Sequence, residues 1–162
     1  MESEFERLIL DVSEKIVIDP NVRSLCVYPY PDHPKGCPNF GKKEGCPPKV
    51  CMIQNFVDLR QVFFLIVRFN LAQHIIKMKE LHPSWTNRQT KCLLYWQPHV
   101  RVEQKIMERD FFIVWNRSQL NITYSPEAMG VDVFKTLEAY NIPYERNPKS
   151  EVVKVALVGR KW

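Results

Sequence analysis

The stretch Cys26-Val-Tyr-Pro-Tyr-Pro-Asp-His-Pro-Lys-Gly-Cys37-Pro-Asn-Phe-Gly-Lys-Lys-Glu-Gly-Cys46-Pro-Pro-Lys-Val-Cys51 constrains the rest of the chain. It holds four of the five cysteines, six of the twelve prolines and three of the five glycines. Each proline fixes φ and removes a backbone donor, so neither a helix nor a long strand can run through it. A loop this long is uncommon in a compact domain unless something holds it together. Four thiolates on one metal centre would do so.

The cysteine spacing bears on which metal the loop would hold. Cys26, Cys37, Cys46 and Cys51 are separated by ten, eight and four residues. Structural zinc sites usually use cysteine pairs that are closer together, and only the last spacing qualifies. Two of the cysteines precede proline, as in the Cys-Pro ending of ferredoxin motifs. The pattern therefore favours an iron–sulfur cluster of the 4Fe-4S kind, with Zn²⁺ as the alternative, and leaves open whether Cys51 is a ligand.

Two segments carry a resemblance to a known family. Gly36-Cys37-Pro-Asn-Phe-Gly-Lys-Lys, followed by Cys46-Pro-Pro, resembles the signature of a family of predicted metal-binding proteins of unknown function. Ser125-Pro-Glu-Ala-Met-Gly-Val-Asp-Val-Phe-Lys-Thr136 is similar to that family's second segment. Many members carry a Cys-x-x-Cys pair in the middle of the chain, where this chain has only Cys92. The resemblance implies metal binding and does not specify a reaction.

Composition predicts one globular domain spanning residues 1–162. The chain is 45% hydrophobic and 25% charged, with a formal net charge of +5, which is typical of a globular protein. The first ten residues lack the basic and apolar pattern of a signal peptide, and the longest apolar run is too short to span a bilayer. We therefore expect a cytoplasmic protein with no membrane partner. Thiols in that compartment stay reduced, which favours metal binding over disulfides.

Hydrophobic periodicity predicts helices separated by strands. In the first half of the chain, the expected elements are a helix over 2–17, a short strand over 22–27, a buried strand over 62–69 and a helix over 71–81. They are followed by one long helix over 86–112, or two helices with a break at Pro98, and by an extended segment over 122–124. A helix from 125 to about 140, with Ser125 as its N-cap, and a strand over 151–158 complete the pattern. This order predicts an α/β or α+β fold, with a small sheet, helices packed around it and a long metal-binding cysteine loop.

A second candidate site lies in the middle of the chain. Tyr95 and Trp96 stand among basic residues that include Arg88, and aromatic faces beside arginines can stack nucleic-acid bases. Aromatic residues at helical spacing also serve as core, so both interpretations stay open. Cys92 is a candidate for a thiol near a substrate, or for a small buried apolar residue.

Two functions follow from these patterns. One is a cytosolic metalloprotein that binds an iron–sulfur cluster through its cysteine loop, with a redox or sulfur-chemistry role and a redox partner or small-molecule substrate. The alternative is a zinc-stabilised binding module that contacts nucleic acid or a protein partner through the basic-aromatic helix. The sequence does not decide whether the protein is an enzyme.

Overall fold

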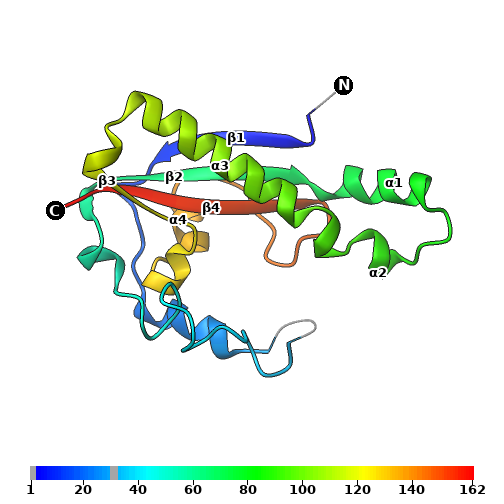
Figure 1. The fold of residues 1–162 in the computed structure, drawn as a ribbon, viewed down its shortest axis with the longest axis horizontal. Coiled ribbons are helices and arrows are strands. Elements are labelled where there is room, and N and C mark those ends of the chain that lie inside the picture. Colours follow the sequence, from blue (N-terminus) through cyan, green and yellow to red (C-terminus); the bar gives the residue numbers. More distant parts are fainter. Residues whose placement is uncertain (1–2, 30–32) are drawn as a thin grey trace. The chain divides into compact units, whose positions relative to one another are not determined.

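The computed structural model describes residues 3–29 and 33–162, and it has an α+β fold (Figure 1). Four antiparallel strands form one sheet in the order β1-β2-β4-β3. The strands are β1 Phe5–Asp11, β2 Asp58–Asn70, β3 Leu120–Thr123 and β4 Glu151–Arg160. The α-helices are α1 Leu71–Leu81, α2 Asn87–Thr90, α3 Gln97–Val114 and α4 Val133–Ala139. The 3₁₀ helices are η1 Pro20–Val27, η2 Ile53–Asn55, η3 Leu93–Tyr95, η4 Arg117–Gln119 and η5 Pro126–Met129.

The chain forms two compact units. The first comprises Met1–Leu10, Leu65–Asn116 and Pro143–Lys154. The second comprises Asp11–Phe64, Arg117–Ile142 and Val155–Trp162. Within the described ranges, no helix combines the length and apolar character needed to cross a membrane.

In the first unit, β2 runs directly into α1, because the Asn70 side chain accepts a hydrogen bond from the Gln73 backbone N–H and caps the helix. The core of this unit centres on Phe69, which is 1% exposed. The rings of Phe5, His74 and Trp96 surround it, with centroids 5.1, 5.6 and 5.4 Å away. Burial among these rings lowers the pKa of His74, because it disfavours the charged form of the imidazole.

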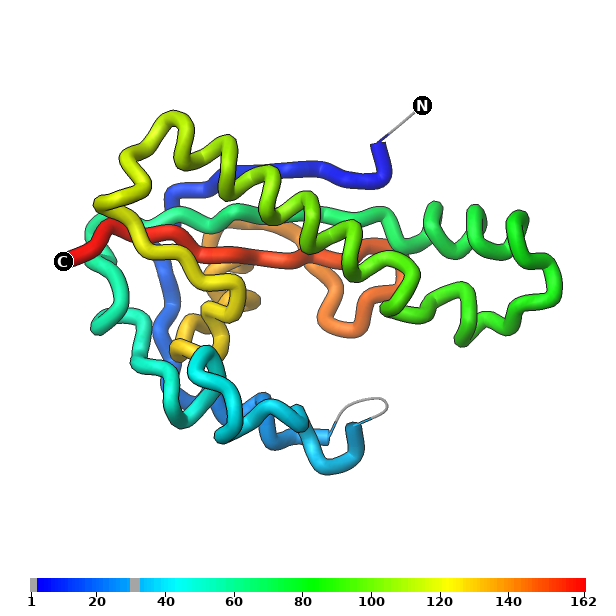
Figure 2. Tube along the Cα trace, in the orientation of Figure 1, coloured from blue at the N-terminus to red at the C-terminus, as the bar shows by residue number. Residues whose placement is uncertain are grey.

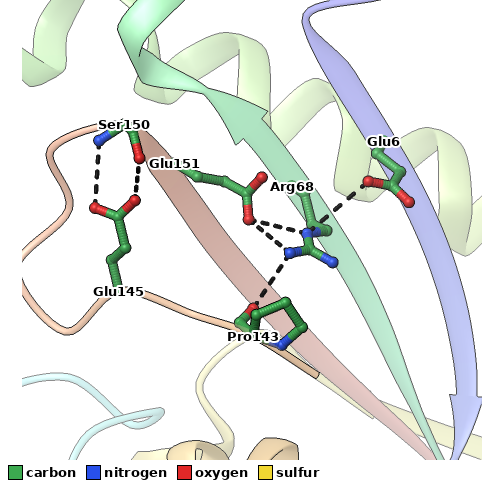
Figure 3. Close-up of polar contacts among 6 residues, drawn as sticks. All are labelled: Glu6, Arg68, Pro143, Glu145, Ser150 and Glu151. Atoms are coloured by element: carbon green, nitrogen blue, oxygen red, sulfur yellow. Dashed lines mark hydrogen bonds and ion pairs between the residues drawn. The ribbon is translucent and has the colours of Figure 1, made fainter. Parts of the chain in front are cut away.

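Polar contacts inside the first unit agree with the strand order. Arg68 on β2 lies between Glu6 of β1 and Glu151 of β4 (Figure 3). Its Nη2 lies 2.7 Å from a Glu151 carboxylate oxygen and donates to the Pro143 carbonyl at 3.3 Å. Since the Arg68 side chain is only 15% exposed, this pair is better shielded from water than a typical surface ion pair.

In the second unit, the start of β2 and the end of β4 contribute buried residues to the core. Val57 and Gly159 are packed so closely that a Cβ at Gly159 would lie 2.6 Å from the Val57 Cβ. Asp132 caps the N-terminus of helix α4, since its side chain accepts a hydrogen bond from the Lys135 backbone N–H. The buried Thr136 hydroxyl then accepts from the Val17 N–H at 3.0 Å, which ties α4 to the segment after β1.

The continuous apolar segments behave as predicted. The strand expected over 62–69 lies within β2, the helix over 71–81 is α1, and the strand over 151–158 lies within β4. The region 86–112 is divided into α2, η3 and α3, but the break lies before α3 and not at Pro98. Pro98 occupies the first turn of α3, where its missing N–H is tolerated. The extended segment predicted over 122–124 overlaps strand β3.

Three predicted elements are wrong. The helix predicted over 2–17 is wrong: Phe5–Asp11 form strand β1, and the residues from Val12 to Val17 form a turn and irregular backbone. The segment pairs with β2 instead of coiling, and just after β1 the Val12 N–H donates to the Val62 carbonyl at 3.0 Å. The strand over 22–27 is part of the 3₁₀ helix η1, which starts at Pro20 under an Asp19 cap. The helix from 125 is divided by Gly130, whose φ of 87° ends η5, and Ser125 makes no side-chain cap.

Acid titration should weaken the second unit. The Arg60 guanidinium, hydrogen-bonded to Asp58, lowers the pKa of that carboxyl to about 2. A carboxyl with a lowered folded pKa binds fewer protons than in the unfolded chain, so its stabilisation is present above about pH 4 and is lost as the pH falls through about 2. We expect Asp58→Asn to flatten the fall in unfolding free energy over this range, measured by urea unfolding. Glu14→Gln, at an exposed position, is the control; an equal flattening there would contradict the assignment.

Candidate metal centre

The cysteine loop begins with a tight contact between two of its cysteines. The Cys37 N–H donates to the Cys26 carbonyl at 2.7 Å. This approach depends on Gly36, which has a φ of 82° and whose Cβ, if present, would lie 2.7 Å from the Cys26 carbonyl oxygen. The backbone therefore joins residues eleven positions apart, and residues 30–32 of the intervening loop lie outside the described part of the chain.

A second set of hydrogen bonds brings Cys46 into the same part of the loop. The Gly41 N–H donates to the Pro47 carbonyl at 2.7 Å, and the Val50 N–H donates to the Cys46 carbonyl at 3.1 Å. The Phe40 N–H donates to the Cys37 carbonyl at 3.2 Å. Successive turns therefore replace regular secondary structure, as the proline and glycine content predicts.

Arg23 fastens this loop to the rest of the second unit. Its guanidinium donates to the Val50 carbonyl at 2.6 Å and, through Nε, to the Ala128 carbonyl at 3.0 Å. Helix η1, which carries Arg23 and Cys26, packs against η5 (Figure 2). One side chain thus links three chain segments: η1, the end of the cysteine loop, and η5.

The thiols of Cys26, Cys37 and Cys46 and the Glu127 carboxylate interact electrostatically. Burial raises the pKa of the Cys26 thiol, and the negative charges of Cys37, Cys46 and Glu127 raise it further. These groups therefore lie close enough to oppose a thiolate at Cys26, and a bound cation would reverse that effect. Cys51 is exposed, and all five cysteines are free thiols.

The donor chemistry fits a thiophilic metal, but the side chains do not form a closed coordination site. Thiolate sulfur is the ligand type that zinc and iron–sulfur clusters prefer. Within residues 3–29 and 33–162, no group of three or more His, Cys, Asp or Glu side chains is placed to hold a metal ion. The backbone hydrogen bonds of the loop bring Cys37 next to Cys26, and bring Gly41 next to Pro47, the residue after Cys46.

The second predicted group of site residues belongs to the first unit, whereas the cysteine loop belongs to the second. Trp96 is 5% exposed, stacks on Phe69, and donates its indole N–H to the Lys91 carbonyl at 3.1 Å, so it is a core residue. Tyr95 is half exposed and contacts the Trp85 ring. Arg88 is exposed on α2, and Cys92 is half-buried at the start of η3.

Sequence reasoning missed Arg23 and left the role of Glu127 open. Arg23 precedes Cys26 by one 3₁₀ turn, and no motif in the sequence marks it as the link between loop and core. Glu127 reads from the sequence mainly as a residue at a helix N-terminus, although its place in the second family-like segment is a usable signal. Its approach to Cys26 follows from the packing of η1 against η5.

The chain was compared with known proteins in three ways. No family model, no curated protein and no solved structure matches it. The resemblance to the family of predicted metal-binding proteins therefore stays a prediction.

Proposed function

We propose that this protein is a metalloprotein whose loop of residues 26–51 binds an iron–sulfur cluster. The observation that carries the proposal is the backbone hydrogen bond from the Cys37 N–H to the Cys26 carbonyl, made possible by Gly36. Cys46 lies in the same electrostatic environment. Three thiolates in one loop repel one another, so each is disfavoured unless a bound cation offsets their charge. The fourth ligand would come from Cys51 or from the Glu127 carboxylate.

A cluster suits this loop better than a single zinc ion. Of the cysteine separations of ten, eight and four residues, only the last is as short as zinc usually requires, and zinc sites commonly use a closely spaced pair at each end. A four-iron cluster presents ligand positions that are farther apart, and four thiolates on it leave a charge of about −2. Lys35, Lys42, Lys43 and Lys49 flank the cysteines in the sequence and would offset that charge.

The proposed role is redox or sulfur chemistry in a reducing compartment such as the cytoplasm. An iron–sulfur cluster supplies electron transfer, or an iron with an open position that can bind a substrate. The chain itself would contribute thiolate ligands and the Arg23 anchor that keeps the loop on η5. A redox partner or a small-molecule substrate is part of the proposal.

A zinc-stabilised binding module is the second candidate, and one observation in the first unit favours it. Leu93, Leu94 and Tyr95 are 53%, 78% and 46% exposed on consecutive positions. With Arg88 also exposed nearby in sequence, they provide an apolar and basic surface of the kind that contacts a protein or nucleic-acid partner. In this alternative, the metal would only stabilise the loop.

The experiment that tests the proposal is metal analysis of the protein purified without oxygen. Iron, zinc and acid-labile sulfide are measured per chain, together with the visible spectrum. We expect about four irons, about four sulfides and a brown protein, because thiolate-bound iron absorbs visible light. One zinc per chain and no colour would favour the zinc-stabilised module over the cluster. If neither iron nor zinc is bound, the proposal is rejected.

A further inference from the structure

A basic pocket lies in the second unit, and the metal proposal does not involve it. It has a volume of about 500 Å³. Its walls come from the start of β2, from η4, and from the end of β4 with the two residues after it. The lining residues are Asp58, Arg60, Ser118, Gln119, Arg160, Lys161 and Trp162.

Backbone pairing holds the walls of this pocket in place. β3 pairs with β4 in the register Leu120↔Arg160, and the Lys161 N–H donates to the Gln119 carbonyl at 2.8 Å. The Trp162 indole N–H donates to the Gln54 carbonyl at 3.1 Å. These hydrogen bonds fix Arg160, Lys161 and Trp162 against the rest of the second unit.

The charge of the pocket is positive. Asp58 accepts hydrogen bonds from Nε and Nη2 of Arg60, at 3.0 and 2.7 Å, so these two charges are largely paired with each other. Arg160 also lies close enough to contribute to the lowered pKa of Asp58. Three cations against one carboxylate leave an excess of two positive charges at a concave surface, which concentrates anions there.

The remaining groups match a phosphate joined to a flat ring. Arginine and lysine are the usual partners of phosphate oxygens, and the hydroxyl and amide of Ser118 and Gln119 can also hydrogen-bond to them. Trp162 is 77% exposed, so its indole face is open to a planar ligand although its N–H is fixed. Aromatic faces of this kind stack nucleobases.

We propose that this pocket binds a small nucleotide, with its phosphate on Arg160 and Lys161 and its base on Trp162. The site is separate from the cysteine loop, so the inference does not depend on the proposed metal centre. A nucleotide is favoured over a simple anion because the pocket combines excess positive charge with an exposed indole.

Isothermal titration of the full chain with AMP, ribose 5-phosphate and adenosine tests this inference. We expect saturable AMP binding that is tighter than that of either fragment, because the two fragments each keep only one of the two contacts. Arg160→Gln should weaken AMP binding about tenfold, since a charged hydrogen bond is lost. Trp162→Ala should reduce the preference for AMP over ribose 5-phosphate.

The control variant is Lys135→Gln, which removes one positive charge from an exposed position on α4 in the same unit. It should leave AMP binding within about twofold of wild type, because its charge is screened by salt. Equal weakening by Arg160→Gln and Lys135→Gln, or no AMP binding by a chain that melts like a folded protein, would overturn the proposal. Thermal melting of each variant separates loss of the site from loss of the fold.

Discussion

Replacing Cys37 by serine is expected to remove most of the metal that the cysteine loop is proposed to bind. Cys37 is joined to Cys26 by the 2.7 Å backbone hydrogen bond, and its charge contributes to the raised pKa of the Cys26 thiol. A serine hydroxyl is a poor ligand for a thiophilic metal, so the remaining thiolates would have to hold the centre with an incomplete set. Metal content per chain should fall from near stoichiometric to a small fraction, measured with the visible spectrum under anaerobic conditions.

Cys92→Ser is the matched control, since Cys92 lies in the first unit and the loop lies in the second. It should keep full metal content. Cys26→Ser and Cys46→Ser should behave like Cys37→Ser, because the three thiols share one electrostatic environment. A folded Cys37→Ser variant with full metal content and an unchanged spectrum would contradict the ligand assignment.

Cys51→Ser and Glu127→Gln then identify the fourth ligand. Cys51 is exposed, whereas the charge of Glu127 acts directly on the Cys26 thiol. If Cys51 is the ligand, Cys51→Ser loses metal and Glu127→Gln retains it. If the carboxylate is the ligand, the order is reversed.

The strands that could be predicted are those whose burial is continuous. In β2, the run from Phe64 to Val67 is buried, and its β-branched and aromatic composition has no competing helical interpretation. In β1, by contrast, Ile9 is 50% exposed and the apolar residues fit both periods. Only the pairing with β2 selects the strand, and that pairing is a long-range contact which the local sequence does not encode.

For the candidate metal centre, the sequence indicated the loop and its cysteines, whose assignment as ligands stays a prediction, but it did not indicate what anchors the loop. Proline and cysteine density in 26–51 indicates a loop held by thiols, and the structure places three of the four cysteines in one electrostatic environment. The contact of Arg23 with Val50 and Ala128 crosses 27 and 105 residues of sequence. A guanidinium bound to carbonyl groups leaves no motif, because any residue can supply a carbonyl.

The basic pocket could not be predicted, because its residues are brought together only by strand pairing. Asp58 and Arg60 stand at the start of β2, and Arg160 stands at the end of β4. In an antiparallel pair these two ends lie side by side, so residues far apart in the sequence become neighbours. In the sequence they appear as isolated charges, which are most often ordinary surface residues.

Phe69→Ala is expected to cost about 3–5 kcal/mol of unfolding free energy. The ring is 1% exposed and is enclosed by Phe5, His74 and Trp96, so its removal loses both the transfer energy of the side chain and the contacts of three neighbouring rings. The Trp96 indole is fixed by its bond to the Lys91 carbonyl, so it cannot easily move to fill the space. Such a loss is comparable with the whole stability of many domains, about 5–15 kcal/mol.

Urea unfolding of wild type, Phe69→Leu and Phe69→Ala measures this loss. Phe69→Leu is the milder substitution, which is expected to stay folded even if the Phe69→Ala variant does not. Ile76→Ala on α1 is the control, because that side chain is 60% exposed, and its effect should stay within about 0.5 kcal/mol. Equal losses at Phe69 and Ile76 would mean that the aromatic cluster is not the core of the first unit. The cysteine loop belongs to the second unit, so metal content measured on folded Phe69→Leu should match that of wild type. A loss of metal in that variant would show that the two units are energetically coupled through the strands they share.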